Sequence, residues 1–280
     1  MFTAKVTNSR GDSLTLFPSN LYYCEITDGL TPPRATLNYS VVGTNDGSIF
    51  NSARLENRNL VLQITPLQDI ERSRINLYRF FRVKQLCTFY FKNGSRDVYI
   101  EGYVESVDGD LFSNKQTIQI SIMCTKPYFK AIEETVTDVS QIMPLFSFPF
   151  AISAAGIEFS EILKRPERNV YNDGDSETGV IIELRAIGAV SNPRIYEEAG
   201  GGIGINIDML EGDIITINTN VGEKAVTLFR DGVETNIINK VQPNPTWFKL
   251  QPGDNVFSYA ADGLDLLQIV FKHYSQFEGV

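Results

Sequence analysis

The side chains that most often carry catalysis are scarce in this sequence and lie far apart. The chain of 280 residues has one histidine, His273, and three cysteines, Cys24, Cys87 and Cys124. Catalytic triads and metal centres usually draw on several such residues. His273 follows the last expected strand, and we expect it to be a surface residue rather than a base or a ligand. The cysteine count is odd and the spacings are long, so we expect three buried, reduced thiols.

Two short motifs resemble functional sites but have simpler explanations. The run Gly200–Gly204 lacks the Gly-Lys-Ser/Thr ending and the βαβ setting of a phosphate loop. It therefore predicts a flexible bend into a strand over residues 203–207. Arg10-Gly11-Asp12 matches an adhesion tripeptide, and we expect it to be a turn between two strands.

Acidic residues do not form a recognisable site either. Pairs such as Glu211 with Asp213 are expected to be solvated turns, since two glycosidase carboxylates must face one cleft. Calcium at Asp173-Gly174-Asp175 is conceivable because hard cations take oxygen ligands, but the rest of an EF-hand loop is missing. We therefore predict no catalytic residue, no metal ligand and no cofactor, and expect a protein that is not an enzyme.

Two sets of side chains remain as candidates for binding. Trp247 is the only tryptophan and could stack on a sugar ring, although packing in a core or at a sheet edge is the simpler expectation. Arg72, Arg79 and Arg82 lie on the basic face of an expected helix and could meet a neighbouring subunit. In the alternative interpretation, this helix only covers the sheet of its own domain.

That helix is expected over residues 69–81. Asp69 and Glu71 place negative charge in its first turn, which suits the positive end of a helix dipole. An apolar stripe formed by Ile70, Leu77, Tyr78 and Phe81 follows the helical period. It is the only helix expected in the first half of the chain.

Elsewhere the dominant pattern is period-two alternation of β-branched and aromatic residues, interrupted by Gly, Asn, Asp and Pro, which predicts antiparallel strands. One hairpin is expected over residues 86–101, where Asn93-Gly94 favours a two-residue turn with positive φ at both positions. A second is expected over residues 226–238 around Asp231-Gly232. Further strands are expected over residues 117–122, 179–188, 213–218, 255–259 and 266–271.

The charge distribution supports two domains, over residues 1–131 and 132–280. Lys and Arg exceed Asp and Glu by three in the first range, whereas Asp and Glu exceed Lys and Arg by 12 in the second; the net charge is −9. Between them, residues 142–157 are apolar but contain Pro144, Pro149 and Gly156, so they predict strands or a linker rather than a helix. The fold class expected is mainly β.

No apolar segment is long enough for a signal peptide or a membrane helix. We therefore expect a protein that is made in a cytoplasm and is not inserted in a membrane. The negative net charge disfavours wrapping of DNA on a basic surface, and no specific nucleic-acid binding is predicted.

Two blocks of the sequence resemble the siphophage distal tail proteins. Residues 60–130 contain a strand, the helix ERSRINLYRFF, the hairpin LCTFYFKNGSRDVYIEGYVESV and the ending IQISIMCTKPYF. Residues 192–279 contain an Asn-Pro-x-Ile opening, a hairpin with Asp-Gly, the segment LQPGDNVFSY and a closing FEGV. The connecting region, residues 138–172, departs from the shorter members of the family.

The resemblance implies a fold and an assembly. Residues 1–131 would form a β-sandwich-like domain with one α-helix that assembles into a six-fold ring. Residues 132–280 would form a peripheral β-sandwich, a jelly roll like that of galectins and carbohydrate modules. The implied function is that of a structural hub, a homohexamer that joins the tail tube to the tip and adhesion apparatus.

The resemblance also implies partners and a location. The partners would be the tail tube protein, a tail-associated tip protein or the tape measure, and a receptor-binding protein. The location would be the virion tail tip, after synthesis in the cytoplasm of a bacterial host. The alternative is a carbohydrate-binding module protein that recognises glycan on the host surface, with Trp247, Tyr171 or Tyr196 as its aromatic platform.

Overall fold

The computed structural model describes residues 2–280 except 44–45, 114–115, 140–166 and 199, and it contains two compact units. Unit 1 comprises Met1–Ile132 and Gln276–Val280, and unit 2 comprises Glu133–Ser275. The segment 142–157, expected to be strands or a linker, lies outside the described residues. No helix in the described parts of the chain is long and apolar enough to cross a membrane.

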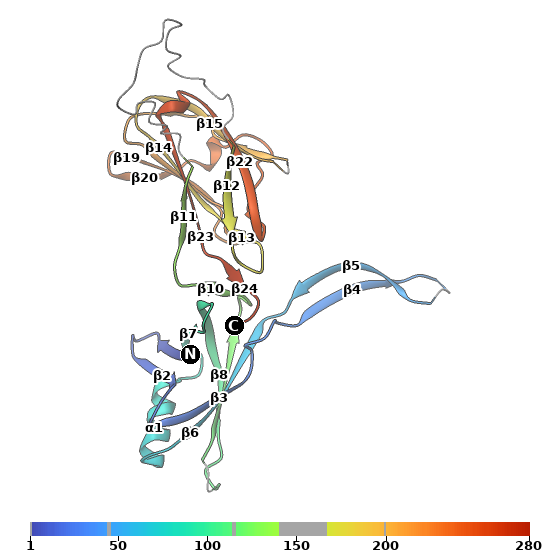
Figure 1. The fold of residues 1–280 in the computed structure, drawn as a ribbon, viewed down its shortest axis with the longest axis vertical. Helices are drawn as coiled ribbons and strands as arrows, with labels where there is room; N and C mark the ends of the chain where they lie inside the picture. The colour runs from blue at the N-terminus through green and yellow to red at the C-terminus, as the bar shows by residue number, and fades with distance from the viewer. Residues whose placement is uncertain (1, 44–45, 114–115, 140–166, 199) are drawn as a thin grey trace, which may run out of the picture. The chain divides into compact units, whose positions relative to one another are not determined.

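Unit 1 is built on one strongly curved, nine-stranded sheet with the strand order β2-β1-β7-β8-β9-β6-β3 and the short strands β10 and β24 attached to it (Figure 1). Its strands are antiparallel. Their bounds are β1 Thr3–Asn8, β2 Ser13–Phe17, β3 Tyr22–Asp28, β6 Arg58–Pro66, β7 Leu86–Lys92, β8 Asp97–Gly109, β9 Ile118–Cys124, β10 Phe129–Ala131 and β24 Gln276–Phe277.

The core of unit 1 lies on the inner face of this sheet. Along β6, Leu60, Leu62 and Ile64 are fully buried, and the residues between them are less so. Because side chains alternate between the two faces of a strand, this pattern places every second residue in the core. Phe89 and Phe91 of β7 do the same, with ring centroids 6.4 Å apart.

Helix α1 (Ile70–Phe80) lies within the range expected from the sequence. Leu77 and Phe81, which follows the last turn, are buried in the core of unit 1. The expected apolar stripe is wrong at its first position, because Ile70 is 42% exposed at the helix N-terminus. Only the later turns of the helix reach the core.

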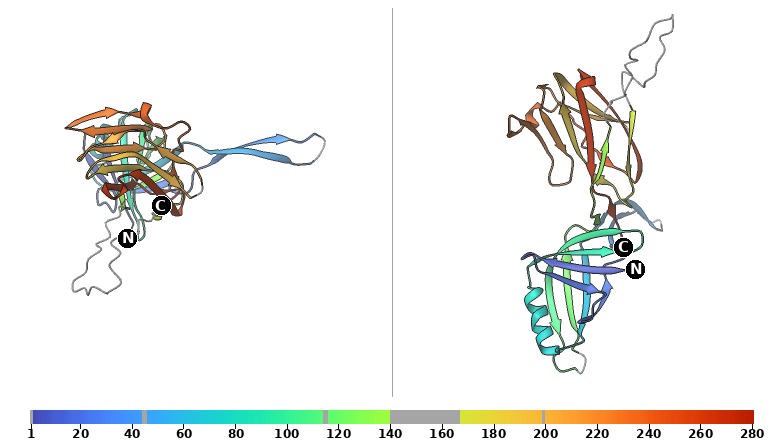
Figure 2. Two further views of the ribbon diagram at one scale, coloured as in Figure 1. Left: turned by 90° about the horizontal axis from the view of Figure 1, so that it is seen from above. Right: turned by 60° about the vertical axis from the view of Figure 1, so that its left-hand side comes forward.

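The hairpin of strands β4 (Ala35–Val41) and β5 (Ser48–Leu55) forms a separate two-stranded sheet in unit 1. The two strands pair only with each other and extend away from the curved sheet (Figures 1 and 2). The hairpin is inserted between β3 and β6, which are neighbours in that sheet.

The end of the chain also belongs to unit 1. Strand β24 pairs with β10, so that Phe277 lies opposite Phe129. The guanidinium of the buried Arg58 donates to the carbonyl oxygens of Gly29, Thr31, Pro127 and Glu278. This one side chain therefore connects the segment before the β4–β5 hairpin with residues 276–280, a long-range connection that the sequence analysis did not predict.

Unit 2 consists of two larger sheets around one core. The six-stranded sheet has the order β11-β23-β14-β18-β19-β20, and the other has the order β12-β22-β15-β16 with β17 added to β15. The first contains β11 Thr135–Asp138, β14 Ile181–Ala186, β18 Ile214–Asn218, β19 Ala225–Arg230, β20 Val233–Asn236 and β23 Leu267–His273. The second contains β12 Glu167–Asn172, β15 Val190–Glu197, β16 Gly202–Gly204, β17 Asp208–Met209 and β22 Gly253–Asp262. Short elements complete the unit: β13 Thr178–Gly179, β21 Lys249–Leu250, and the 3₁₀ turns η1 Ile238–Lys240 and η2 Leu264–Leu266.

Of the two predicted hairpin turns, the one between β19 and β20 is confirmed and the one between β7 and β8 is wrong. Between β19 and β20, Asp231 and Gly232 have φ of 52° and 79°, as a two-residue turn with positive φ requires. Between β7 and β8 the expected turn is wrong, because neither Asn93 nor Gly94 has a positive φ. The Asn93 side-chain oxygen instead accepts hydrogen bonds from the backbone amides of Ser95 and Arg96, which gives a longer turn.

Candidate assembly surfaces

The structure gives the only histidine a different setting from the one expected. His273, at the end of β23, is 2% exposed rather than a surface residue. Burial lowers the pKa of His273, because an imidazolium is costly to desolvate, and Asp173 partly opposes this effect. The side chain is therefore held neutral inside unit 2.

Asp213 corrects the expectation that the acidic pairs are solvated turns. Its carboxylate is 2% exposed and accepts hydrogen bonds from Arg230 Nε at 2.9 Å and from the Leu210 amide at 2.7 Å. The bond from Arg230 is the main reason that the pKa of Asp213 is lowered, and burial opposes it. This pair links β18 to β19, which is a structural role.

The described residues contain no group of three or more His, Cys, Asp or Glu side chains that could hold a metal ion. All three cysteines are free, and Cys87 and Cys124 are buried while Cys24 is partly exposed. Burial raises the pKa of Cys87 to about 11 and those of Cys24 and Cys124 to about 12. Because the thiolate is the nucleophile, these cysteines are unreactive near neutral pH.

Trp247 lies just before β21, half-buried against the core of unit 2. The Lys224 ammonium lies over its ring, 5.4 Å from the centroid. This setting favours a packing role over glycan stacking. Gly201, with φ of 101°, lies close to the same loop, since a Cβ there would be 2.3 Å from the Thr246 hydroxyl oxygen. The glycine run therefore allows the backbone before β16 to lie close to Thr246.

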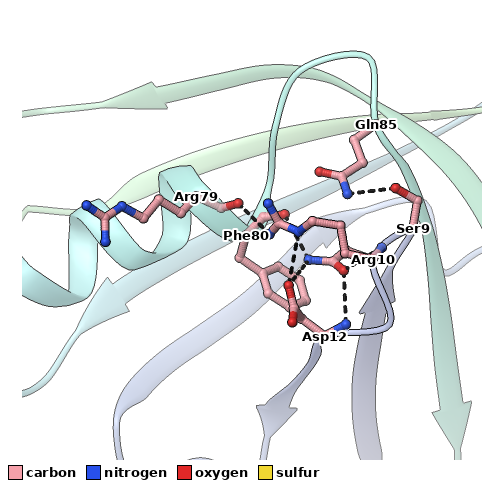
Figure 3. A network of polar contacts seen from close by, with 7 residues as sticks. Ser9, Arg10, Asp12, Arg79, Phe80 and Gln85 are labelled. Atoms are coloured by element: carbon pink, nitrogen blue, oxygen red, sulfur yellow. Dashed lines mark hydrogen bonds and ion pairs between the residues drawn. The ribbon is translucent and has the colours of Figure 1, made fainter.

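The Arg10-Gly11-Asp12 turn closes the C-terminal end of α1 (Figure 3). Arg10 Nη2 donates to the Arg79 carbonyl oxygen at 2.8 Å, and its Nε donates to Asp12 at 3.1 Å. The Asn8 side-chain oxygen accepts from the amides of Arg10 and Asp12. A cation at the last carbonyls suits the negative end of the helix dipole. The tripeptide is therefore a helix cap.

The three arginines named as interface candidates, Arg72, Arg79 and Arg82, are all exposed. Arg72 and Arg79 belong to α1, and Arg82 follows its end. With Arg10 they place several positive charges along the helix and its capping turn. This basic face is available for contact with another protein.

The β4–β5 hairpin is the most unusual surface of unit 1. Cross-strand partners share one face of a hairpin, and Tyr39 lies opposite Phe50 while Leu37 lies opposite Ala53. Leu37, Tyr39 and Phe50 are 57%, 65% and 63% exposed. Val41, on the same face, is exposed as well. This face of the hairpin is apolar and uncovered by the described part of the chain.

The opposite face of the hairpin is mainly polar, with one exposed apolar side chain, Ile49, which lies opposite Ser40. Asn38 Nδ2 donates to the Ser52 hydroxyl at 3.0 Å, and Asn51 Nδ2 donates to the Ser40 hydroxyl at 2.7 Å. A two-stranded hairpin is marginally stable by itself in water, and a contiguous exposed apolar surface usually marks an interaction site. The apolar face of the hairpin is therefore a candidate interaction surface. We refer to the β4–β5 hairpin as the arm.

Sequence analysis missed this hairpin, although a signal was present. Leu37, Tyr39 and Val41 alternate with Asn38 and Ser40, which is the pattern of an amphipathic strand. β4 ends at Val41 and β5 begins at Ser48, so six residues, among them Asp46-Gly47, separate the two strands, and this longer spacing concealed the pairing.

The comparisons with known proteins agree with the resemblance found in the sequence. Residues 173–273, within unit 2, match the family described as siphovirus-type tail component, C-terminal domain. No curated protein sequence matches the chain.

Three solved structures are similar to the whole chain. One is the SPP1 Dit (gp 19.1) protein, described as a paradigm of the hub adsorption apparatus in phages that infect Gram-positive bacteria; it is 13% identical over 99% of both chains, with a TM-score of 0.70. The others are chains of the phage P2 baseplate in its activated conformation with Ca and with Sr, each 12% identical over 100% of both chains, with TM-scores of 0.52 and 0.54. They confirm the mainly β fold with a single α-helix in the described residues.

Proposed function

We propose that this chain, which belongs to the siphovirus-type tail components, forms a six-membered ring that joins the phage tail tube to the adhesion apparatus at the tail tip. The family match in unit 2 and the whole-chain likeness to a hub protein support this role. The role is structural, with no catalytic step. Its location is the virion tail tip, reached after synthesis in the host cytoplasm.

The exposed apolar face of the β4–β5 hairpin is the observation that carries the proposal. In a monomer, Leu37, Tyr39 and Phe50 would remain in water. Covering apolar surface is favourable by about 25 cal/mol per Å². A second copy of the chain is the natural cover, because every copy has the same arm to bury and a ring covers all of them equally.

We assign the two units to different tasks within this ring. Unit 1, built largely from residues 1–131, forms the ring, and its basic face at Arg72, Arg79 and Arg82 provides a further subunit contact. Residues 132–280, with an excess of 12 acidic residues, form the peripheral part. Electrostatic complementarity would then favour basic surfaces on partner proteins.

The other proposed partners follow from the position of a hub. The tail tube protein stacks on one side of the ring, and a tail-associated tip protein or the tape measure occupies the other side. A receptor-binding protein docks on the peripheral unit. None of these contacts requires specific binding of nucleic acid.

The mass in solution tests the ring directly. Light scattering of the purified chain should give about six times 31.4 kDa, and electron micrographs of the same peak should show six-fold views. The double variant Tyr39→Ser/Phe50→Ser should be monomeric, because it removes apolar surface from the arm without touching the core of unit 1.

The matched control lies on the other face of the same arm. Asn38→Ala/Ser52→Ala removes a side-chain hydrogen bond from the polar face and should leave the mass unchanged. A wild-type chain that stays monomeric at high concentration would contradict the proposal, and so would an apolar-face variant with the full mass of the ring.

A further inference from the structure

Unit 2 has a small depression beside strand β16. Its volume is about 330 Å³, which lies at the lower end of the range for small-molecule pockets, roughly 300–1,000 Å³. It is lined by side chains of β15, by a loop that follows η1 and by the glycine run: Arg194, Tyr196, Gln242, Pro243, Pro245 and residues 201–204. We refer to this depression as the β15–β16 pocket.

Two glycines of β16 make room for the side chains that line the pocket. In the antiparallel register, Tyr196 lies opposite Gly202 and Arg194 lies opposite Gly204. A Cβ on Gly202 would be 2.9 Å from Tyr196 Cδ1. A Cβ on Gly204 would be 3.1 Å from Arg194 Cγ and 2.7 Å from Gln242 Cδ. The aromatic ring and the stem of the arginine therefore lie against the bare backbone of β16, where any larger residue would displace them.

The charge of Arg194 points to an anionic ligand. Residues 132–280 contain 12 more acidic than basic residues, and ion pairs within unit 2 already hold Arg185, Arg230, Lys249 and Lys272. Arg194 is exposed in this acidic unit, yet no carboxylate pairs with it in the described part of the chain. An anion entering the pocket would meet a cation whose charge is not already neutralised.

A neutral group holds the guanidinium in place. The Gln242 amide lies 3.1 Å from Arg194 Nη2 and 3.3 Å from Nε, and its oxygen accepts from both when it is turned toward them. The guanidinium has five N–H groups, so three remain for a ligand. Gln242 therefore positions the charge of Arg194 without cancelling it, as a binding site for an anion requires.

The rest of the lining suits a sugar ring. Tyr196 is partly exposed at the pocket, and the electron-rich face of an aromatic ring attracts the C–H groups of a saccharide. The amides of Gln242 and Asn206 are hydrogen-bonded at 2.8 Å, and amides can both donate to and accept from sugar hydroxyls. A small inorganic anion would use the guanidinium alone and leave the tyrosine ring without a contact.

We propose that the β15–β16 pocket binds a saccharide whose ring carries an anionic group, either a carboxylate or a phosphate. Arg194 pairs with the anion through two parallel hydrogen bonds, and Tyr196 packs against the sugar ring. This site adds a ligand to the proposed hub. It does not depend on the ring, because every residue that lines the pocket belongs to unit 2.

Saturation-transfer NMR with the full chain tests the proposal, since it detects weak ligands of a large particle. The probes are glucuronate, glucose 6-phosphate and glucose, which share one ring and carry a carboxylate, a phosphate or no charge. One or both acids should give a clear signal, and glucose should give a much weaker one at the same concentration. The two acids together identify the preferred anion. Equal signals from all three probes, or no signal from any of them, would overturn the proposal.

Replacement of the arginine tests the ionic contact. Arg194→Gln should weaken binding of the acidic sugar about tenfold, because the charge-assisted hydrogen bonds are lost. Arg185→Gln is the matched control, since Arg185 is an exposed arginine of the same unit that pairs with Glu183 and does not line the pocket. It should leave the affinity unchanged. Equal affinities of the two variants would reject the role of Arg194.

Replacement of the tyrosine tests the contact with the sugar ring. Tyr196→Leu should weaken binding several-fold, whereas Tyr171→Leu should not; Tyr171 is 56% exposed in the same sheet but does not line the pocket. Binding that needs Arg194 but survives Tyr196→Leu in full would reveal a site for simple anions and reject the saccharide.

Circular dichroism and light scattering of the same samples check folding and keep the two proposals separate. A full ring that binds neither acid would overturn the saccharide site and leave the hub intact. A monomer that binds an acidic sugar through Arg194 would overturn the ring and leave the site intact.

Discussion

Two hairpins of unit 1 share the same alternation of apolar and polar residues but differ in what covers the apolar side. In the β7–β8 hairpin, Phe89, Phe91 and Ile100 are buried within the curved sheet. In the β4–β5 hairpin, Tyr39 and Phe50 face solvent. The pattern of a strand therefore indicates that one side will be covered, but not whether the same chain supplies the cover.

Truncation of one aromatic ring in each hairpin is the strongest test of this contrast. Phe91→Ala should lower the free energy of unfolding of unit 1 by about 3–5 kcal/mol, because it opens a cavity in a packed core. Phe50→Ala should change monomer stability by about 0.5 kcal/mol or less, yet weaken assembly. Urea denaturation and light scattering measure the two effects. Similar losses of monomer stability in both variants would remove the distinction.

Arg58 anchors the connection to the β4–β5 hairpin. Its replacement should destabilise unit 1 more than a replacement on the exposed faces of the hairpin. Arg58→Met should destabilise unit 1 by about 2–3 kcal/mol, because four carbonyl oxygens lose a charged donor. Arg34→Met is the matched control, since Arg34 is exposed on the same connection and should contribute about 0.5 kcal/mol or less. Thermal unfolding would compare the two, and equal shifts would show that Arg58 is not an anchor.

Acidification should lower the stability of unit 2 without affecting the contacts made by the β4–β5 hairpin. The lowered pKa of His273 means that the unfolded chain binds a proton more readily than the folded one. The stability of unit 2 should therefore be full above about pH 6.5 and fall as the pH drops below it toward the folded pKa. His273→Gln should flatten this dependence in denaturation measured from pH 7.5 to 5.5. Residues 35–55 contain no histidine, so ring mass should not follow the same curve.

The smallest effect should come from the turns of two hairpins. Gly232 has a positive φ, and a Cβ added to it would meet no other atom within 4 Å, so Gly232→Ala should cost about 1 kcal/mol through backbone strain alone. Gly94 also has open space but no positive φ, and Gly94→Ala should cost less than about 0.5 kcal/mol. Denaturation midpoints would show the difference, and a reversed order would contradict the turn geometry.

Much of the fold could be predicted because local pattern and final environment agree. The alternation in β7, β8 and β18 specified strands, and the helix over Ile70–Phe80 followed from its apolar period and charges. Predictions failed where a side chain outweighed the expected backbone preference. Asn93 is the clear example, because its amide oxygen organises a longer turn than Asn-Gly alone favours.

The candidate surfaces were harder to predict than the strands. The basic residues of α1 could be named from helical spacing alone, because an exposed helix face needs no tertiary contact to be recognised. The β4–β5 hairpin could not, because the significance of Tyr39 and Phe50 depends on their remaining uncovered after folding. The buried settings of His273 and Asp213 likewise depend on tertiary contacts that single-sequence patterns do not contain.

The return of β24 to unit 1 has a consequence for the order of events during translation. The ribosome releases residues 276–280 only after the whole of unit 2 has emerged, so nascent chains hold an incomplete first unit for most of their synthesis. Phe277 and the Glu278 carbonyl reach Phe129 and Arg58 last. We therefore expect prematurely terminated chains to be poor substrates for assembly, which would restrict the growing virion to chains synthesised through this final segment.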